Sequence, residues 1–185
     1  MKKLLLSLAI ILGLSTVANA QEVGKMWIGG SVGVKTSKVK DGDRLTNFNI
    51  IPEFGYVLSD NWGIGIKLGY EHNEYLEKAD KMKSDGFLVN PFARYAFLKG
   101  DLGGLFVDGG AGYSYNKIKS TSEKIHEFEV GFRPGVSINV SDKIALTGKF
   151  GFLGYQYEKF GEKKTNSYGF DFDLSQVQFG LNIIF

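Results

Sequence analysis

The 185-residue sequence contains no cysteine and only three prolines, and beyond residue 20 it has no long hydrophobic run. Disulfides and thiolate metal sites are therefore excluded. The missing run excludes a membrane-spanning helix in residues 21–185. An excess of one charge is also missing there. Two of the 22 basic residues and none of the 20 acidic residues lie in residues 1–20, so the remainder is balanced. This balance argues against a nucleic-acid partner.

The first twenty residues have the three parts of a secretion signal. Lys2 and Lys3 form a positive start, Leu4–Leu14 is apolar, and Val17–Ala20 offers small residues for cleavage. A retained membrane helix is the alternative, but the run is short for that purpose. We predict a signal peptide at residues 1–20, cleaved after Ala20, and one domain at residues 21–185.

The rest of the chain alternates apolar residues with small or polar ones, as strands do. From Trp62 to Tyr70 the alternation is strict, with Gly and Lys between the apolar residues. Eight such segments are predicted, at 26–36, 47–58, 62–71, 87–98, 105–116, 128–140, 144–155 and 170–185. In the last, the apolar phase slips near Ser175, which indicates a bulge or a strand start. Short connections (59–61, 99–104, 141–143) alternate with longer polar ones (37–46, 72–86, 117–127, 158–169).

The three prolines occupy equivalent positions in this pattern. The segment from Pro52 through Ser59 to Gly69 recurs 82 residues later from Pro134 through Ser141 to Gly151. Pro91 begins a similar segment. Because proline cannot donate a hydrogen bond to a ladder, its recurrence suggests a bulge or bend at each site.

The segments fit an eight-stranded barrel whose apolar face could point either way. In a soluble barrel of lipocalin type that face would point inward. The opposite face would then meet water, yet it is mainly Gly, Ser, Asn and Ala, which suits the narrow interior of eight strands better. Aromatic residues also gather at both ends of the strands, as at membrane interfaces. These residues are Tyr56, Trp62, Tyr70, Tyr95, Tyr113 and Tyr115. We therefore predict an all-β fold: an eight-stranded antiparallel up-and-down transmembrane β-barrel.

The chain resembles the small OmpX/OmpA-type outer-membrane β-barrel family over residues 21–185. The resemblance rests on Pro52–Ser59, Pro91–Tyr95, Tyr113 and the terminal Phe185. It implies a place in the outer membrane of a Gram-negative cell, with outer-membrane lipids and lipopolysaccharide as neighbours. It also implies passage through periplasmic chaperones and the barrel assembly machinery. The alternating apolar residues of the last strand would be the assembly signal: Phe179, Leu181, Ile183 and Phe185.

The inward face carries charges, which need partners in a low-dielectric interior. The predicted lumen network consists of Glu53, Lys67, Arg94, Asp108, Glu129, Arg133 and Lys149. A paired network that plugs the barrel is favoured over an ion or solute path, because eight strands leave little room for an open, porin-like channel.

No catalytic, metal or cofactor site is predicted. His72 and His126 lack the spacing of a metal site. A lipid-A-modifying enzyme could use His126 with Ser120 or Ser122, but nothing fixes a nucleophile–base geometry. We therefore expect a non-enzymatic protein with a structural or surface-interaction role through four extracellular loops. The alternatives are the lipid-modifying enzyme and a narrow pore.

The predicted outer loops are rich in lysine. They hold 12 of the 20 basic residues beyond residue 20: Lys38, Lys40, Arg44, Lys78, Lys81, Lys83, Lys117, Lys119, Lys124, Lys159, Lys163 and Lys164. These charges could simply keep the loops soluble, or they could contact lipopolysaccharide phosphates or an unknown surface ligand.

Overall fold

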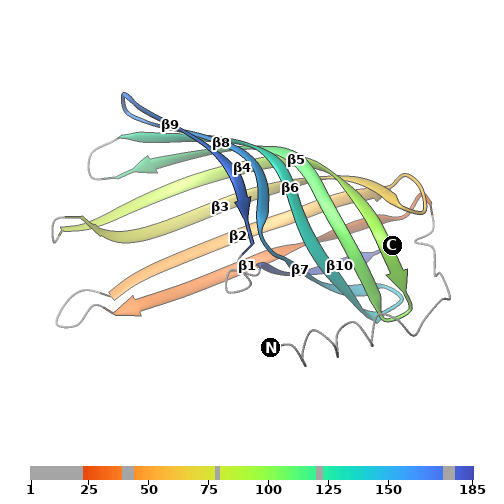
Figure 1. Ribbon diagram of the computed structural model, residues 1–185. Helices are drawn as coiled ribbons and strands as arrows, with labels where there is room; N and C mark the ends of the chain where they lie inside the picture. The colour runs from red at the N-terminus through yellow and green to blue at the C-terminus, as the bar shows by residue number, and fades with distance from the viewer. Residues whose placement is uncertain (1–22, 39–43, 78–79, 120–122, 173–177) are drawn as a thin grey trace, which may run out of the picture.

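The computed structural model describes residues 23–38, 44–77, 80–119, 123–172 and 178–185, and they form one curved antiparallel sheet (Figure 1). The predicted signal peptide, Ser120, Ser122 and Ser175 lie outside these residues. The ten strands are β1 (Met26–Lys38), β2 (Arg44–Val57), β3 (Trp62–Glu77), β4 (Asp80–Gly100), β5 (Gly103–Ile118), β6 (Lys124–Ser141), β7 (Ile144–Lys149), β8 (Phe152–Phe160), β9 (Lys163–Asp171) and β10 (Gln178–Ile184). No helix among the described residues has the length and apolar character to cross a membrane.

The sheet closes on itself through eight strand paths. Each of β1 to β6 pairs with the next strand, β7 joins β6 to β10, and β10 returns to β1. At the junction, Trp27 to Gly30 pair with Ile184 to Leu181. Backbone bonds of 2.8 and 3.0 Å between Met26 and Phe185 extend it. The predicted fold, an eight-stranded antiparallel barrel, is confirmed.

The seventh and eighth paths are each divided into two strands. The seventh is interrupted at Phe150 and Gly151, between β7 and β8. The partners of β6 shift by one residue there, since Gly135 faces Lys149 but Phe132 faces Leu153. The eighth path consists of β9 and β10. Among the described residues, β9 pairs with β8 alone, and the last eight residues of β1 pair with β2 alone. Among the described residues, the pairing that closes the ring between β1 and β10 therefore lies at the end that carries Phe185.

The prolines interrupt hydrogen-bond ladders, but only one of them accompanies a bulge. Pro134 lies beside the one-residue shift between β7 and β8, where the Phe150 amide bonds its carbonyl at 3.1 Å. At Pro52 the ladder to β3 misses two pairs, and at Pro91 the ladder to β5 does the same. The register on either side is unchanged in both cases. Of the two predicted alternatives, a bulge or a bend, the bulge is therefore absent at Pro52 and Pro91, because a missing donor removes ladder bonds without requiring an extra residue.

The predicted long loops are largely strand. The β3–β4 ladder continues to the pair Glu77 and Asp80, and β5 pairs with β6 as far as Lys117 and Lys124. The hairpins therefore extend well past the predicted strand ends, and their tips lie away from the C-terminus (Figure 1). The short connections gather at the other end, near the terminal Phe185. Cross-strand pairing extends these hairpins through polar segments in which apolar and polar residues do not alternate.

Glycines on the inner face make room for three inward aromatic rings. A Cβ atom on Gly55 would lie 1.9 Å from the Trp27 ring, and one on Gly65 would lie 2.5 Å from the Phe92 ring. A Cβ on Gly135 would similarly meet Phe106 at 2.4 Å. Trp27, Phe92 and Phe106 are all buried. The interior is thus filled by pairing a large residue on one strand with glycine on its neighbour.

The outer face is apolar and exposed. Exposed large side chains follow every strand path, from Ile28 and Phe54 to Phe132 and Phe179. Polar and charged side chains such as Glu53, Asn90 and Asp108 are instead buried inside the ring. This is the reverse of a lipocalin-type soluble barrel, and it is the distribution that lipid requires.

We predict that Gly55→Ala destabilises the barrel by about 1–3 kcal/mol, because the added methyl collides with the buried Trp27 ring. The matched control is Gly169→Ala, where a Cβ meets nothing within 4 Å. The measurement is the free energy of unfolding in urea from detergent micelles. Equal stability of the two variants would contradict this packing.

Candidate functional site

Five charged side chains meet at the centre of the lumen, one from each of β2, β3, β4, β5 and β7. Arg94 lies between two carboxylates: its Nη2 donates to Glu53 Oε1 at 2.9 Å, and its Nε donates to Asp108 Oδ1 at 2.7 Å. Lys149 Nζ also joins both carboxylates, at 3.2 Å from Asp108 Oδ2 and in closer contact with Glu53. Lys67 Nζ lies 3.5 Å from Asp108 Oδ2. We call these five residues the central cluster.

The other two residues of the predicted network form a pair on β6. Arg133 Nη2 donates to Glu129 Oε2, and the two residues are four positions apart on the same strand. Asn90 Nδ2 donates to the other carboxylate oxygen of Glu129 at 3.0 Å. The seven predicted residues thus lie inside the ring in two ion-paired groups, one of five residues and one of two.

Aromatic rings hold the central cluster, and we did not predict their role from the sequence. The Trp27 indole donates from Nε1 to Glu53 Oε1 at 3.0 Å. The Arg94 guanidinium lies over Phe106 at 4.2 Å, and Lys67 lies over Phe92 at 4.6 Å. Such cation–π contacts stabilise desolvated cations. The sequence already indicated that Trp27 points inward, because the two-residue period of a strand places it on the same face as the inner glycines Gly29 and Gly33.

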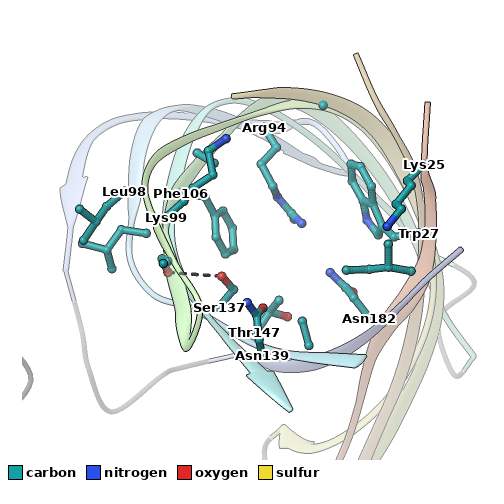
Figure 2. A pocket seen from close by; sticks show the side chains of 18 of the residues that line it. Lys25, Trp27, Arg94, Leu98, Lys99, Phe106, Ser137, Asn139, Thr147 and Asn182 are labelled. Carbon is teal, nitrogen blue, oxygen red and sulfur yellow. Dashed lines mark hydrogen bonds between the residues drawn. The ribbon is translucent and has the colours of Figure 1, made fainter. Parts of the chain in front are cut away.

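A cavity lies on each side of this cluster. The first, which we call the vestibule, occupies about 690 Å³ at the end of the barrel with the short connections. Arg94, Trp27 and Phe106 line it together with polar side chains of Thr147 and Asn182 (Figure 2). The second, of about 330 Å³, lies toward the hairpins and is lined by Glu71, Glu127, Glu129 and Glu158 beside Lys67 and Arg133. The two cavities share no lining residue.

Aromatic residues mark both edges of the apolar band. Trp62 packs against Tyr95 near the short connections, with ring centroids 4.8 Å apart. Tyr70 packs against Phe87 near the hairpins at 5.5 Å. Such girdles are typical of membrane interfaces.

A polar cluster lies outside the apolar band, just beyond the edge that is nearer the hairpins. Asp85 on β4 accepts hydrogen bonds from Tyr70 at 3.0 Å and His72 at 2.6 Å, and Lys119 Nζ lies 2.7 Å from its second oxygen. The bond from His72, followed by that from Lys119, lowers the pKa of Asp85 from 3.8 to about 2.

Glu74 connects β3 to the adjacent hairpin. It accepts the Thr46 amide at 2.8 Å, and its own amide donates to Asn47 Oδ1 at 3.0 Å. Lys83 Nζ lies 3.2 Å from its carboxylate. Together with Asp85, these bonds join β2, β3, β4 and the end of β5.

The two histidines have different neighbours. His72 contacts Asp85, whereas His126 Nδ1 lies 2.7 Å from the Tyr113 hydroxyl on β5. Among the described residues, no group of three or more His, Cys, Asp or Glu side chains could hold a metal ion. Ser120 and Ser122, the serines considered for a hydrolase, lie outside those residues.

The predicted assembly signal is on the outer face of β10 and at the residue after it. Phe179, Leu181, Ile183 and Phe185 are all exposed there, while Asn182 between them points into the vestibule (Figure 2). The four side chains form one continuous apolar stripe beside β1.

Comparison with known proteins agrees with this architecture. The family model of the outer membrane protein beta-barrel domain matches residues 4–185. Among solved structures, the chain is similar to Neisserial surface protein A, with 13% identity and a TM-score of 0.54, over 86% of this chain and 94% of that chain. It is also similar to Ail, the attachment invasion locus protein of Yersinia pestis, with 16% identity and a TM-score of 0.50, over 89% of this chain and 100% of that chain. No curated protein matches significantly.

The first prediction for this site concerns conduction. Because the central cluster fills the space between the two cavities, we expect no steady open state in planar-bilayer recordings of the intact protein. The triple variant Glu53→Ala, Arg94→Ala, Lys149→Ala should conduct if it folds, since it removes the side chains that close the lumen. A reproducible open state of the unaltered protein would contradict the plugged lumen.

The second prediction concerns pH. Because the pKa of Asp85 is lowered, its contribution to folding is fully present above pH 3.8 and is lost as the pH falls through about 2. Carboxyl ¹³C NMR in micelles should place its titration midpoint near 2, and Asp85→Asn assigns the signal. A midpoint near 3.8 would show that the three bonds are not formed in solution.

Proposed function

The chain belongs to the outer membrane protein beta-barrel domain family, and from that premise we propose that it is a non-enzymatic surface protein whose four hairpins contact an anionic ligand outside the cell. In this proposal, residues 1–20 are a signal peptide cleaved after Ala20. Periplasmic chaperones and the barrel assembly machinery then insert the barrel, reading Phe179, Leu181, Ile183 and Phe185.

The observation that carries the proposal is the bonded extension of the hairpins beyond the apolar band. The β3–β4 hairpin is paired as far as Glu77 and Asp80, and Glu74 and Asp85 join it to β2 and to the end of β5. A surface held in this way loses less entropy when it binds a partner than a set of free loops would. The extension is therefore suited to binding.

Charge on the same side supports an anionic ligand. Lys117 and Lys124 are exposed and directly opposite each other on β5 and β6. Neither has an ion-pair partner among the residues that the structure describes. Like charges opposite each other destabilise a ladder, and an anion bound between them relieves that repulsion. Phosphates of lipopolysaccharide are the nearest such groups for a barrel in the outer membrane.

The alternatives have less support. A narrow pore would have to pass the central cluster, where Arg94 and Lys149 join two carboxylates across the lumen. A lipid-modifying hydrolase would need a nucleophile beside His126, and among the described residues the hydroxyl that bonds its ring is that of Tyr113. A surface-interaction role needs neither an open lumen nor a nucleophile.

The test is binding of the barrel in nanodiscs to lipopolysaccharide, in parallel with binding to dephosphorylated lipopolysaccharide. We predict that Lys117→Gln/Lys124→Gln weakens binding about tenfold, the equivalent of 1.4 kcal/mol. The matched control, Lys99→Gln/Lys143→Gln, removes two lysines from the other end and should bind normally. Equal loss in the two variants, or indifference to the phosphates, would refute the proposed ligand.

A further inference from the structure

The central cluster contains one more positive charge than negative. Arg94, Lys67 and Lys149 contact the carboxylates of Glu53 and Asp108, and all five side chains are at most 12% exposed. Among the described residues, no further carboxylate is paired with any of the three cations. A buried charge without a counter-charge is costly in a low-dielectric interior. Lys67 faces the glutamates of the second cavity. The side of the cluster that favours an additional anion is therefore the one that Arg94 presents to the vestibule.

Arg94 has an unused edge that faces the vestibule. Its Nε and Nη2 atoms donate to Asp108 and Glu53, but Nη1 has no partner among the described residues. Figure 2 shows the guanidinium reaching into the cavity between Trp27 and Phe106. The ring of Phe106, 4.2 Å from the guanidinium carbon, fixes its plane. Two N–H donors are thus presented to the cavity in a set orientation.

The vestibule walls can complete such a site. Thr147 and Asn182 are buried polar residues whose side chains line the cavity next to Arg94. Neither side chain has a hydrogen-bond partner among the residues described. Two lysines and two aspartates also line the cavity: Lys25, Lys99, Asp101 and Asp142. The cavity volume of about 690 Å³ is in the range of small-molecule sites.

We propose that the vestibule binds a small monoanion that bears a carboxylate or phosphate group and enters from the end with the short connections. The anion accepts hydrogen bonds from Arg94 Nη1 and from Thr147 or Asn182, and it neutralises the excess charge of the central cluster. A cation is disfavoured by that charge. The site is at the opposite end from the hairpins and does not depend on their ligand.

Trp27 provides a direct test, since it lines the vestibule and is one of only two tryptophans. In the variant Trp62→Phe, Trp27 is the only tryptophan. The protein is studied in a neutral detergent with three quenchers: the anion iodide, the cation caesium, and uncharged acrylamide as the measure of access that does not depend on charge. We expect the ratio of the iodide quenching constant to the caesium quenching constant to be about fivefold higher for Trp27 than for free N-acetyltryptophanamide, because the buried positive charge attracts anions. A ratio equal to or below that of the free compound would overturn the proposal.

Removing the excess charge should remove this preference. Lys67 contributes to the cluster but does not line the vestibule, so Lys67→Met changes the charge without changing the lining. We expect the iodide preference in Trp62→Phe/Lys67→Met to fall to the ratio shown by free N-acetyltryptophanamide. In the control Trp62→Phe/Lys163→Met, which removes an exposed lysine of β9, it should persist. An unchanged preference in the Lys67 variant would refute the charge argument, and the ion comparison above stands even if that variant does not fold.

Competition separates the two ligand chemistries. Acetate and inorganic phosphate are titrated against a fixed iodide concentration at constant ionic strength, with neutral acetamide as the control. Protection of Trp27 by acetate alone identifies a carboxylate site, and protection by phosphate alone identifies a phosphate site. Protection by both identifies a general monoanion site. Protection by neither anion, or equally by acetamide, would overturn the proposal.

Discussion

The narrow interior of an eight-stranded ring is the constraint on which the rest of this structure depends. Such a ring is only wide enough for its own side chains. Every large inward residue must therefore face a small one, as Trp27 faces Gly55 and Phe92 faces Gly65. Every inward charge must find its partner within the ring, because lipid surrounds it. The glycine content, the buried aromatic rings and the ion pairs of the lumen are three consequences of one geometry.

The central cluster illustrates why such charges are arranged as a group. An isolated buried ion pair gains little, since the loss of hydration offsets most of the attraction. Glu53 avoids this by accepting bonds from Trp27, Arg94 and Lys149, so that most of its hydration is replaced. Asp108 is bonded similarly by Arg94 and the two lysines. The cluster joins the four consecutive strands β2 to β5 to β7 on the other side of the lumen, and it sets their relative positions inside the ring.

The sequence was sufficient for the architecture because one periodicity controls both faces of a strand. The alternation from Trp62 to Tyr70 shows directly which residues form the outer face. The residues between them, Lys67 included, must then point inward. The partners of Lys67 could not be predicted, since they depend on the stagger between strands and on rings such as Phe92. The length of the hairpins was also missed. Residues 72–86 contain no apolar alternation, yet residues 72–77 and 80–86 are strand because their cross-strand pairs and the bonds of Asp85 extend the ladder. The break at Phe150 likewise depends on Pro134 of another strand.

The closing ladder gives one end of the barrel a fixed circumference. At the end with the short connections, β10 ties β7 to β1 by backbone hydrogen bonds on both of its edges. A tube whose circumference is tied in this way resists ovalisation at that end. The vestibule therefore lies in a stiff part of the molecule, and its shape is set by the ladder as well as by its lining side chains.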